Sequence, residues 1–312
     1  MRCLIHAGNL DTKKISRFKP YKPRGLSKNS FIRHCEFEYE SRVYAAAKEI
    51  IEENRHIIML TGPSASGKTT TAHKLKDKLI KMGKKARVIS LDNFFKNKDD
   101  YPRLDNGEKD YENVTAIELE LFSSCLNELL NKGVAKFPEF DFTTEMRIED
   151  AIEIEIDDGF IIVEGIHALN PALLELIPKE ETFTIYAGLR EEYSFRGQRI
   201  LPTRDIRMLR RMIRDHKYRG HTPQKTISMW PSVCEGEDKY IKIFKPNADL
   251  LLDTSFSYEI LIMHSALADF QQYADDSPEG QRLLQLLEVF DNIGYLPLGS
   301  LPANSMLAEF FM

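Results

Sequence analysis

The chain has 312 residues, enough to bury one large core or two small ones. Hydrophobic residues make up 42% and charged residues 29%, with a net charge of −5. This composition is that of an ordinary globular protein without a general attraction to nucleic acid. No apolar run approaches the roughly 20 residues that span a bilayer, so we expect no membrane partner. Four scattered cysteines without a C-x-x-C pair indicate free thiols, and we expect a cytoplasmic location.

The first 34 residues are strongly basic, with nine Lys and Arg against the single acid Asp11. Residues 18–25 contain two prolines, which favour an extended chain over a helix. We therefore expect residues 1–35 to form a flexible or surface-draped arm. A contact with nucleic acid or another partner is an alternative. A targeting segment is a further alternative, which the prolines and the missing amphipathic pattern oppose.

An amphipathic helix is predicted over 36–54, followed by a buried strand over 56–60 and a helix over 70–80. Between strand and helix, residues 62–69 read G-P-S-A-S-G-K-T, a complete G-x-x-x-x-G-K-[ST] loop. Such a loop wraps a polyphosphate with its backbone N–H groups, and Mg²⁺ sits on the Thr69 hydroxyl. The sequence therefore predicts an ATP site with Lys68 at the β- and γ-phosphates. Its residues are Gly62, Pro63, Ser64, Ala65, Ser66, Gly67, Lys68, Thr69 and Thr70.

Further strands and helices alternate along the chain. Strands are predicted over 86–91, 152–156, 160–165, 182–187 and 247–252, with an irregular segment or short strand over 137–142. Helices are predicted over 116–131, 204–219, 256–273 and 278–290. This alternation predicts an α/β fold with a mainly parallel sheet in a three-layer α/β/α arrangement typical of P-loop NTPases. We expect a P-loop domain over 36–275, including a lid at about 200–222, and a C-terminal helical extension over 276–312 packed on it.

Two acids stand at predicted strand ends, where ligands of parallel sheets bind. Asp92 is the candidate base that accepts the proton of the attacking hydroxyl, and the alternative is a helix N-cap. Glu164 is the candidate that holds Mg²⁺ through water, and the alternative is a structural acid.

The third signal is a series of arginines at three- and four-residue spacings, which place Arg207, Arg210, Arg211 and Arg214 on one helix face. Like charges packed in this way are favoured by a bound anion, so we expect a mobile lid that closes over the transferred phosphate. A solvated helix face paired with acids elsewhere in the chain is the alternative.

These motifs resemble the uridine kinase/phosphoribulokinase family. The resemblance covers residues 36–312 and rests on the loop at 62–69, S-L-D-N-F-F at 90–95, F-D-F at 140–142 with Arg147, E-G-I-H at 164–167 and D-I-R-M-L-R-R-M-I-R-D at 205–215. Segments such as Y-R-G-H at 218–221 and N-S-M-L-A-E-F at 304–310 resemble bacterial uridine kinase-like proteins that often carry an N-terminal TGS region. Residues 1–35 are too few for that region, so we expect it to be missing.

The resemblance implies ATP-dependent phosphorylation of a primary hydroxyl, most simply a nucleoside 5′-hydroxyl. It implies Asp92 as base, Arg211 and Arg214 as lid arginines at the phosphates, and Glu112 and Arg207 near the sugar. Residues implied around the acceptor are Phe95, Phe140, Glu145 and Arg147.

Two of these positions depart from the family pattern, because Phe140 and Glu145 stand where uridine kinases read the base with Tyr and His. Loss of such groups alters a site built to hydrogen-bond a base. Another sugar or hydroxylated metabolite is therefore an alternative acceptor. A nucleotide-binding regulator with an RNA- or partner-binding arm is a second alternative. For the kinase we expect a small-molecule substrate and no nucleic-acid partner, and self-association stays open.

Overall fold

The computed structural model describes residues 5–6, 14–17, 27–103, 107, 109–110, 112–156, 158–195, 198–291 and 293–312. At its centre lies a six-stranded sheet in the order β1-β11-β8-β3-β7-β4. These strands are β1 (Ile5–His6), β3 (Ile57–Thr61), β4 (Lys85–Ser90), β7 (Gly159–Glu164), β8 (Thr182–Gly188) and β11 (Leu250–Asp253). All pairs are parallel except β1 with β11. The predicted α/β fold with a mainly parallel sheet is confirmed.

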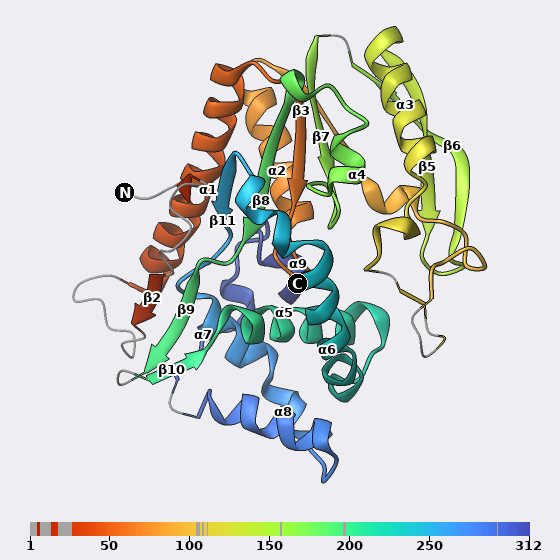
Figure 1. Cartoon of the computed structure of the whole chain (residues 1–312). Coiled ribbons are helices and arrows are strands. Elements are labelled where there is room, and N and C mark those ends of the chain that lie inside the picture. The colour runs from red at the N-terminus through yellow and green to blue at the C-terminus, as the bar shows by residue number, and fades with distance from the viewer. Residues whose placement is uncertain are drawn as a thin grey trace.

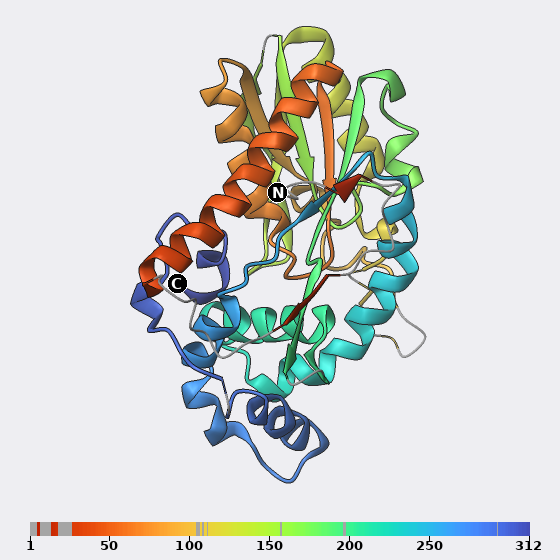
Figure 2. The same ribbon diagram turned by 90° about the vertical axis from the view of Figure 1, so that its left-hand side faces the viewer.

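Alternate side chains of the central strand β3 belong to two different layers. Ile58 and Leu60 pack with side chains of α1 (Lys28–Glu53) and α2 (Lys68–Lys81). Ile57 and Met59 pack with side chains of α3 (Leu119–Lys132) and α4 (Pro171–Leu174). Figure 2 shows the long α1 crossing its face of the sheet. The continuous apolar run of β3 is explained by this burial on both faces.

Two small sheets flank the central one (Figure 1). The first is the hairpin of β5 (Val134–Asp141) and β6 (Met146–Glu155), and the second joins β2 (Lys14–Arg17), β9 (Glu191–Phe195) and β10 (Gln198–Leu201). The segment that we predicted as irregular or a short strand is thus most of an eight-residue strand. Its pairing shifts register between Phe137 and Glu139, because Pro138 has no N–H to donate to the ladder.

Further helices gather beyond the carboxyl ends of the parallel strands, below the sheet in Figure 1. They are α5 (Thr203–Arg219), α6 (Pro223–Tyr240), α7 (Glu259–Ala266), α8 (Pro278–Glu288) and α9 (Ala308–Phe311). Leu283 of α8 and Phe310 of α9 lie in the same core as Ile58 of β3. Short 3₁₀ helices are η2 (Leu91–Phe94), η3 (Val114–Ala116), η4 (Lys179–Glu181), η5 (Lys242–Asn247), η6 (Ala268–Tyr273) and η7 (Leu298–Ser300). None of the described helices combines the length and apolar character needed to cross a membrane.

The first long helix begins earlier than predicted, at Lys28 instead of about residue 36. Ser27 caps it by accepting the backbone N–H of Ser30, and Ile32 and Cys35 are buried by its first turns. The basic residues 28 and 33 therefore belong to a helix. Most of the predicted arm lies outside the described residues.

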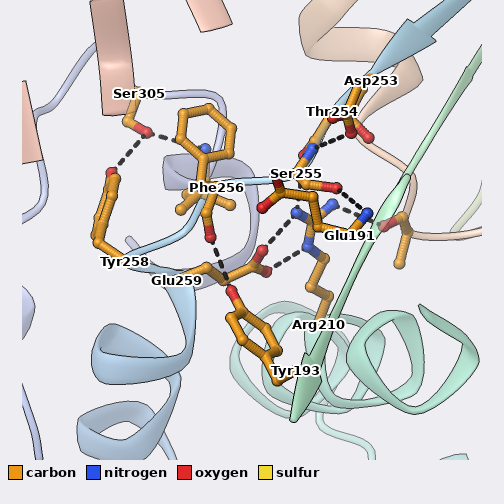
Figure 3. A network of polar contacts seen from close by, with 12 residues as sticks. Glu191, Tyr193, Arg210, Asp253, Thr254, Ser255, Phe256, Tyr258, Glu259 and Ser305 are labelled. Carbon is orange, nitrogen blue, oxygen red and sulfur yellow. Dashed lines mark hydrogen bonds and ion pairs between the residues drawn. The ribbon is translucent and has the colours of Figure 1, made fainter. Parts of the chain in front are cut away.

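A buried ion pair fixes α5 beneath the sheet (Figure 3). Arg210 of α5 is fully buried, and its Nε and Nη2 atoms both donate to the carboxylate of Glu259, the latter at 2.7 Å. Nη2 also donates to the carbonyl of Thr254 at 3.1 Å, beyond the end of β11. This bidentate geometry satisfies both charges in the interior, where an unpaired charge is costly.

We expect Glu259→Gln to lower the free energy of unfolding by about 3–5 kcal/mol, because Arg210 would stay buried without its counter-charge. Urea unfolding followed by far-UV circular dichroism measures the change. The control is Glu128→Gln, which breaks the exposed pair of Glu128 and Lys132 on α3 at 2.9 Å. An exposed pair of this kind contributes about 0.5 kcal/mol. Equal effects of the two variants would contradict the importance of the buried pair.

Candidate active site

The loop Gly62–Thr69 joins β3 to α2 and has the geometry of an anion cradle. Ala65 and Gly67 have positive φ angles of 58° and 83°. The backbone N–H groups at the start of α2 have no acceptor within the helix, and the helix dipole adds positive potential there. A Cβ at Gly62 would collide with the carbonyl oxygen of Ala187 in β8. Glycine is therefore required where the loop passes the neighbouring strand.

Glu164 ends β7 and lies beside this loop. Its side chain is buried, Oε1 accepts the Ser90 hydroxyl at 2.8 Å, and Oε2 accepts the Thr69 hydroxyl at 3.3 Å. Burial raises the pKa of the Glu164 carboxyl, and the charge of Lys68 opposes this shift. The structure thus brings Glu164 of β7 together with Lys68 and Thr69, which follow β3. Ser90, which positions Glu164, was missed, although it stands two residues before Asp92.

The oxygen atoms of Thr69 and Glu164 suit Mg²⁺, which takes one or two protein ligands together with waters and substrate phosphates. Among the described residues, His, Cys, Asp and Glu side chains do not gather in threes into a self-sufficient metal site. These two side chains therefore fit an ion that arrives with a polyphosphate.

Asp92 lies on the same edge of the sheet, in η2 directly after β4. Ser90 is the N-cap of η2, and its hydroxyl accepts the backbone N–H of Asp92. The alternative that Asp92 caps a helix is therefore wrong. Asp92 is half-buried, and its negative charge acts on Glu164 and on Arg219. Asp92 thus has no capping role and lies where the carboxyl ends of the parallel strands form one edge of the sheet.

The arginine face of α5 reaches the same loop. Arg207 donates to the Ser64 carbonyl at 3.0 Å, Arg210 to the Ala65 carbonyl at 3.3 Å, and Arg211 to the Ser64 hydroxyl at 3.0 Å. The predicted common face of these side chains is confirmed. Its geometry brings positive charge to the outer surface of the predicted phosphate cradle.

The arginines of α5 are also paired with acids, as the alternative interpretation expected, but several of these pairs are buried. Asp215 accepts from Arg211 at 3.2 Å, from Arg214 at 3.0 Å and from Arg219 at 3.4 Å. Its side chain is 1% exposed. We missed Asp215, although its spacing of four residues from Arg211 could have indicated the pair.

Arg207, which the resemblance places near a sugar, makes several contacts within the protein. Its guanidinium is buried, bonded to Glu237 of α6 at 2.6 Å and placed over the ring of Trp230. These contacts join α5 to α6, and the role of Arg207 near a sugar stays a prediction. Trp230 itself is a core residue.

Glu112 is held against α6, where a Cβ at Gly236 would collide with its side chain. Burial raises the pKa of Glu112 to about 7, and the nearby charges of Arg211 and Lys68 oppose the shift. The carboxyl group therefore lies within the field of two cations of the site. Glu112 thus lies near Lys68 and Arg211, and its place near a sugar stays a prediction.

The remaining predicted residues form an aromatic and polar wall beside η2. Phe140 packs on Phe95 with ring centroids 5.7 Å apart, and both rings are buried. Arg147 donates to the carbonyl of Phe95 at 3.3 Å. Glu145 accepts from Lys109 at 2.6 Å. The carboxylate at position 145 is thus engaged with a lysine of the preceding loop.

Comparison with known proteins agrees with this arrangement. Residues 57–194 match the model of the Phosphoribulokinase / Uridine kinase family. The uridine kinase of Lactobacillus johnsonii is 27% identical over 207 residues, which cover 66% of this chain and 90% of the relative. The uridine kinase of Macrococcus caseolyticus is 29% identical over 208 residues, or 66% of this chain and 91% of the relative.

Among solved structures, a possible uridine kinase from Bacillus stearothermophilus aligns with a TM-score of 0.48 and 18% identity. That alignment covers 69% of this chain and all of the other. The segment matched by the family model begins in β3 and ends in β9, and it contains the loop, Asp92, Glu112 and Glu164. The resemblance seen in the sequence is confirmed. Over residues 57–194 the chain is similar to the phosphoribulokinase/uridine kinase family, and this similarity indicates a kinase, a phosphotransferase acting on an alcohol group.

Proposed function

We propose that the protein transfers the γ-phosphoryl group of ATP to a primary hydroxyl, with a nucleoside 5′-hydroxyl as the principal acceptor. One observation carries the proposal: Lys68, Glu164 and Asp92 stand at one edge of the sheet, beside a loop with the geometry of an anion cradle. Phosphoryl transfer requires positioned phosphates, neutralised charge and a proton acceptor. The site supplies a candidate for each.

In this proposal the N–H groups at the start of α2 and the Lys68 ammonium bind the triphosphate. Thr69 and, through water, Glu164 would hold Mg²⁺, which neutralises charge on the phosphate oxygens when it is bound. Asp92 accepts the proton of the acceptor hydroxyl. Arg211 and Arg214 stabilise the transferred phosphoryl group from α5.

The acceptor lies between Asp92 and the wall of Phe95 and Phe140 in this proposal. Glu112, held by α6, binds sugar hydroxyl groups. The named uridine kinases with which the chain aligns support a nucleoside. The pairing of Glu145 with Lys109 favours the alternative, a different sugar or hydroxylated metabolite, because that carboxylate is already engaged and cannot replace an imidazole donor.

Asp92→Ala should lower kcat by at least 10²-fold, the range of a lost general base, while the Kd for MgATP changes less than about threefold. A coupled ADP-release assay and isothermal titration calorimetry measure the two quantities. Asp77→Asn, a charge change on the exposed side of α2, is the matched control and should keep full activity. Turnover by Asp92→Ala close to that of the parent chain would refute the assignment of the base.

The acceptor is tested by incubating the chain with labelled ATP and a panel of nucleosides, pentoses, sugar phosphates and hydroxy acids. We expect the highest kcat/KM for a ribonucleoside, with the label on its 5′-oxygen. A sugar or hydroxy acid that exceeds every nucleoside by tenfold or more would replace the nucleoside in the proposal and leave kinase chemistry intact.

Acceptor binding should depend on pH through Glu112. Its raised pKa of about 7 means that the carboxylate, the stronger hydrogen-bond acceptor, forms only as pH rises through neutrality. The acceptor KM should therefore fall between pH 6 and pH 8, and in Glu112→Gln it should be higher and insensitive to pH over this range. Steady-state kinetics at saturating MgATP measure both. An unchanged pH profile in the variant would show that another group is responsible.

A further inference from the structure

Residues 304–311 pack directly on the phosphate-binding loop and its helix. Met306, Leu307, Phe310 and Phe311 are buried in the core that also contains residues of α2 and α5. A Cβ at Gly67, the N-cap of α2, would collide with the sulfur of Met306. Figure 2 shows this end of the chain beside the N-terminal end of α1, where Ser305 donates to Glu36 at 2.6 Å. The segment is thus anchored within contact distance of the loop.

One acidic side chain of this segment reaches α2 itself. The Thr70 hydroxyl donates to Oε2 of Glu309 at 2.5 Å. Thr70 belongs to the first turn of α2, so its backbone N–H is among those without an acceptor in the helix. The Glu309 carboxylate therefore lies beside the first turn of α2, whose backbone N–H groups a triphosphate would need. Its charge also acts on Arg210.

We propose that Glu309 opposes nucleotide binding: its carboxylate holds the Thr70 hydroxyl, and an incoming triphosphate must displace or neutralise that carboxylate. This inference rests on the proposed function, because it assumes that the loop binds a polyphosphate. Two like charges a few ångströms apart repel strongly where water is partly excluded. Removing the charge of Glu309 should therefore strengthen polyphosphate binding, although a hydrogen bond in the free protein is weakened.

The same segment connects the loop to α5. The ring of Phe310 lies 5.0 Å from the guanidinium carbon of Arg210, the residue that bonds to the Ala65 carbonyl and to Glu259. Glu309 and Phe310 are neighbours in α9, so a nucleotide that displaces the Glu309 carboxylate also disturbs the packing of Arg210. The state of the phosphate site is thereby coupled to the helix that carries Arg211 and Arg214.

The test compares Glu309→Gln with the parent chain in the binding of ATP and of inorganic tripolyphosphate, by isothermal titration calorimetry. Glutamine keeps the size of the side chain and its ability to accept from Thr70. We expect the Kd for both ligands to fall by about three- to tenfold at low salt, and the gain to shrink at 0.5 M NaCl, where exposed charges are screened. Glu288→Gln, which removes an exposed charge at the end of α8, is the matched control and should leave both Kd values unchanged.

An equal or higher Kd in Glu309→Gln would overturn the proposal and leave Glu309 a packing residue. If the parent chain itself did not bind ATP, this result would instead refute the proposed function. A second measurement uses the unchanged chain, so that it does not depend on folding of a variant. Hydrogen exchange over residues 304–311 should speed up several-fold when tripolyphosphate saturates the site, and exchange that stays equal or slows would overturn the coupling.

Discussion

The ion pair of Arg210 and Glu259 is the interaction on which the arrangement of the site depends. Arg210 comes from α5 and Glu259 from α7, and the same guanidinium bonds to the carbonyl of Thr254 after β11 and of Ala65 in the loop. A fully buried guanidinium has to satisfy most of its donors, so it constrains every element that supplies an acceptor. This one side chain therefore sets the distance between the phosphate loop and the arginine helix.

This constraint gives α5 two functions on one face. Arg207 and Arg210 are buried and anchor the helix, whereas Arg211 and Arg214 are less buried and share Asp215. The charge of Lys68 acts on Glu112 and on Glu164, which come from separate parts of the chain, and the charge of Asp92 acts on Glu164. Opposite charges thus lie close to one another around the loop and α5, and burial raises the pKa of Glu112 and of Glu164.

Much of the fold was predictable because its signals are local. The run before Gly62 is apolar at every position and becomes a strand buried on both faces, and the spacing of the arginines places them on one helix face. Boundaries were less predictable: the helix capped by Ser27 starts before the amphipathic pattern becomes clear, and the strand at Pro138 continues through a residue that normally ends pairing. The helix start was decided by the Ser27 cap and the burial of Ile32 and Cys35, and the strand by its pairing with β6 on both sides of Pro138.

The sequence by itself determined the phosphate loop, the parallel sheet and the type of chemistry, since each is encoded in a short segment whose residues act together in the chain. Only the tertiary structure decided which arginines are buried anchors and which stay partly exposed, because that depends on Glu237 and Glu259, 30 and 49 residues away from Arg207 and Arg210. The position of Glu309 on Thr70, across 239 residues, was decided in the same way. Contacts of this range follow from how helices pack over the sheet edge, and no local spacing encodes them.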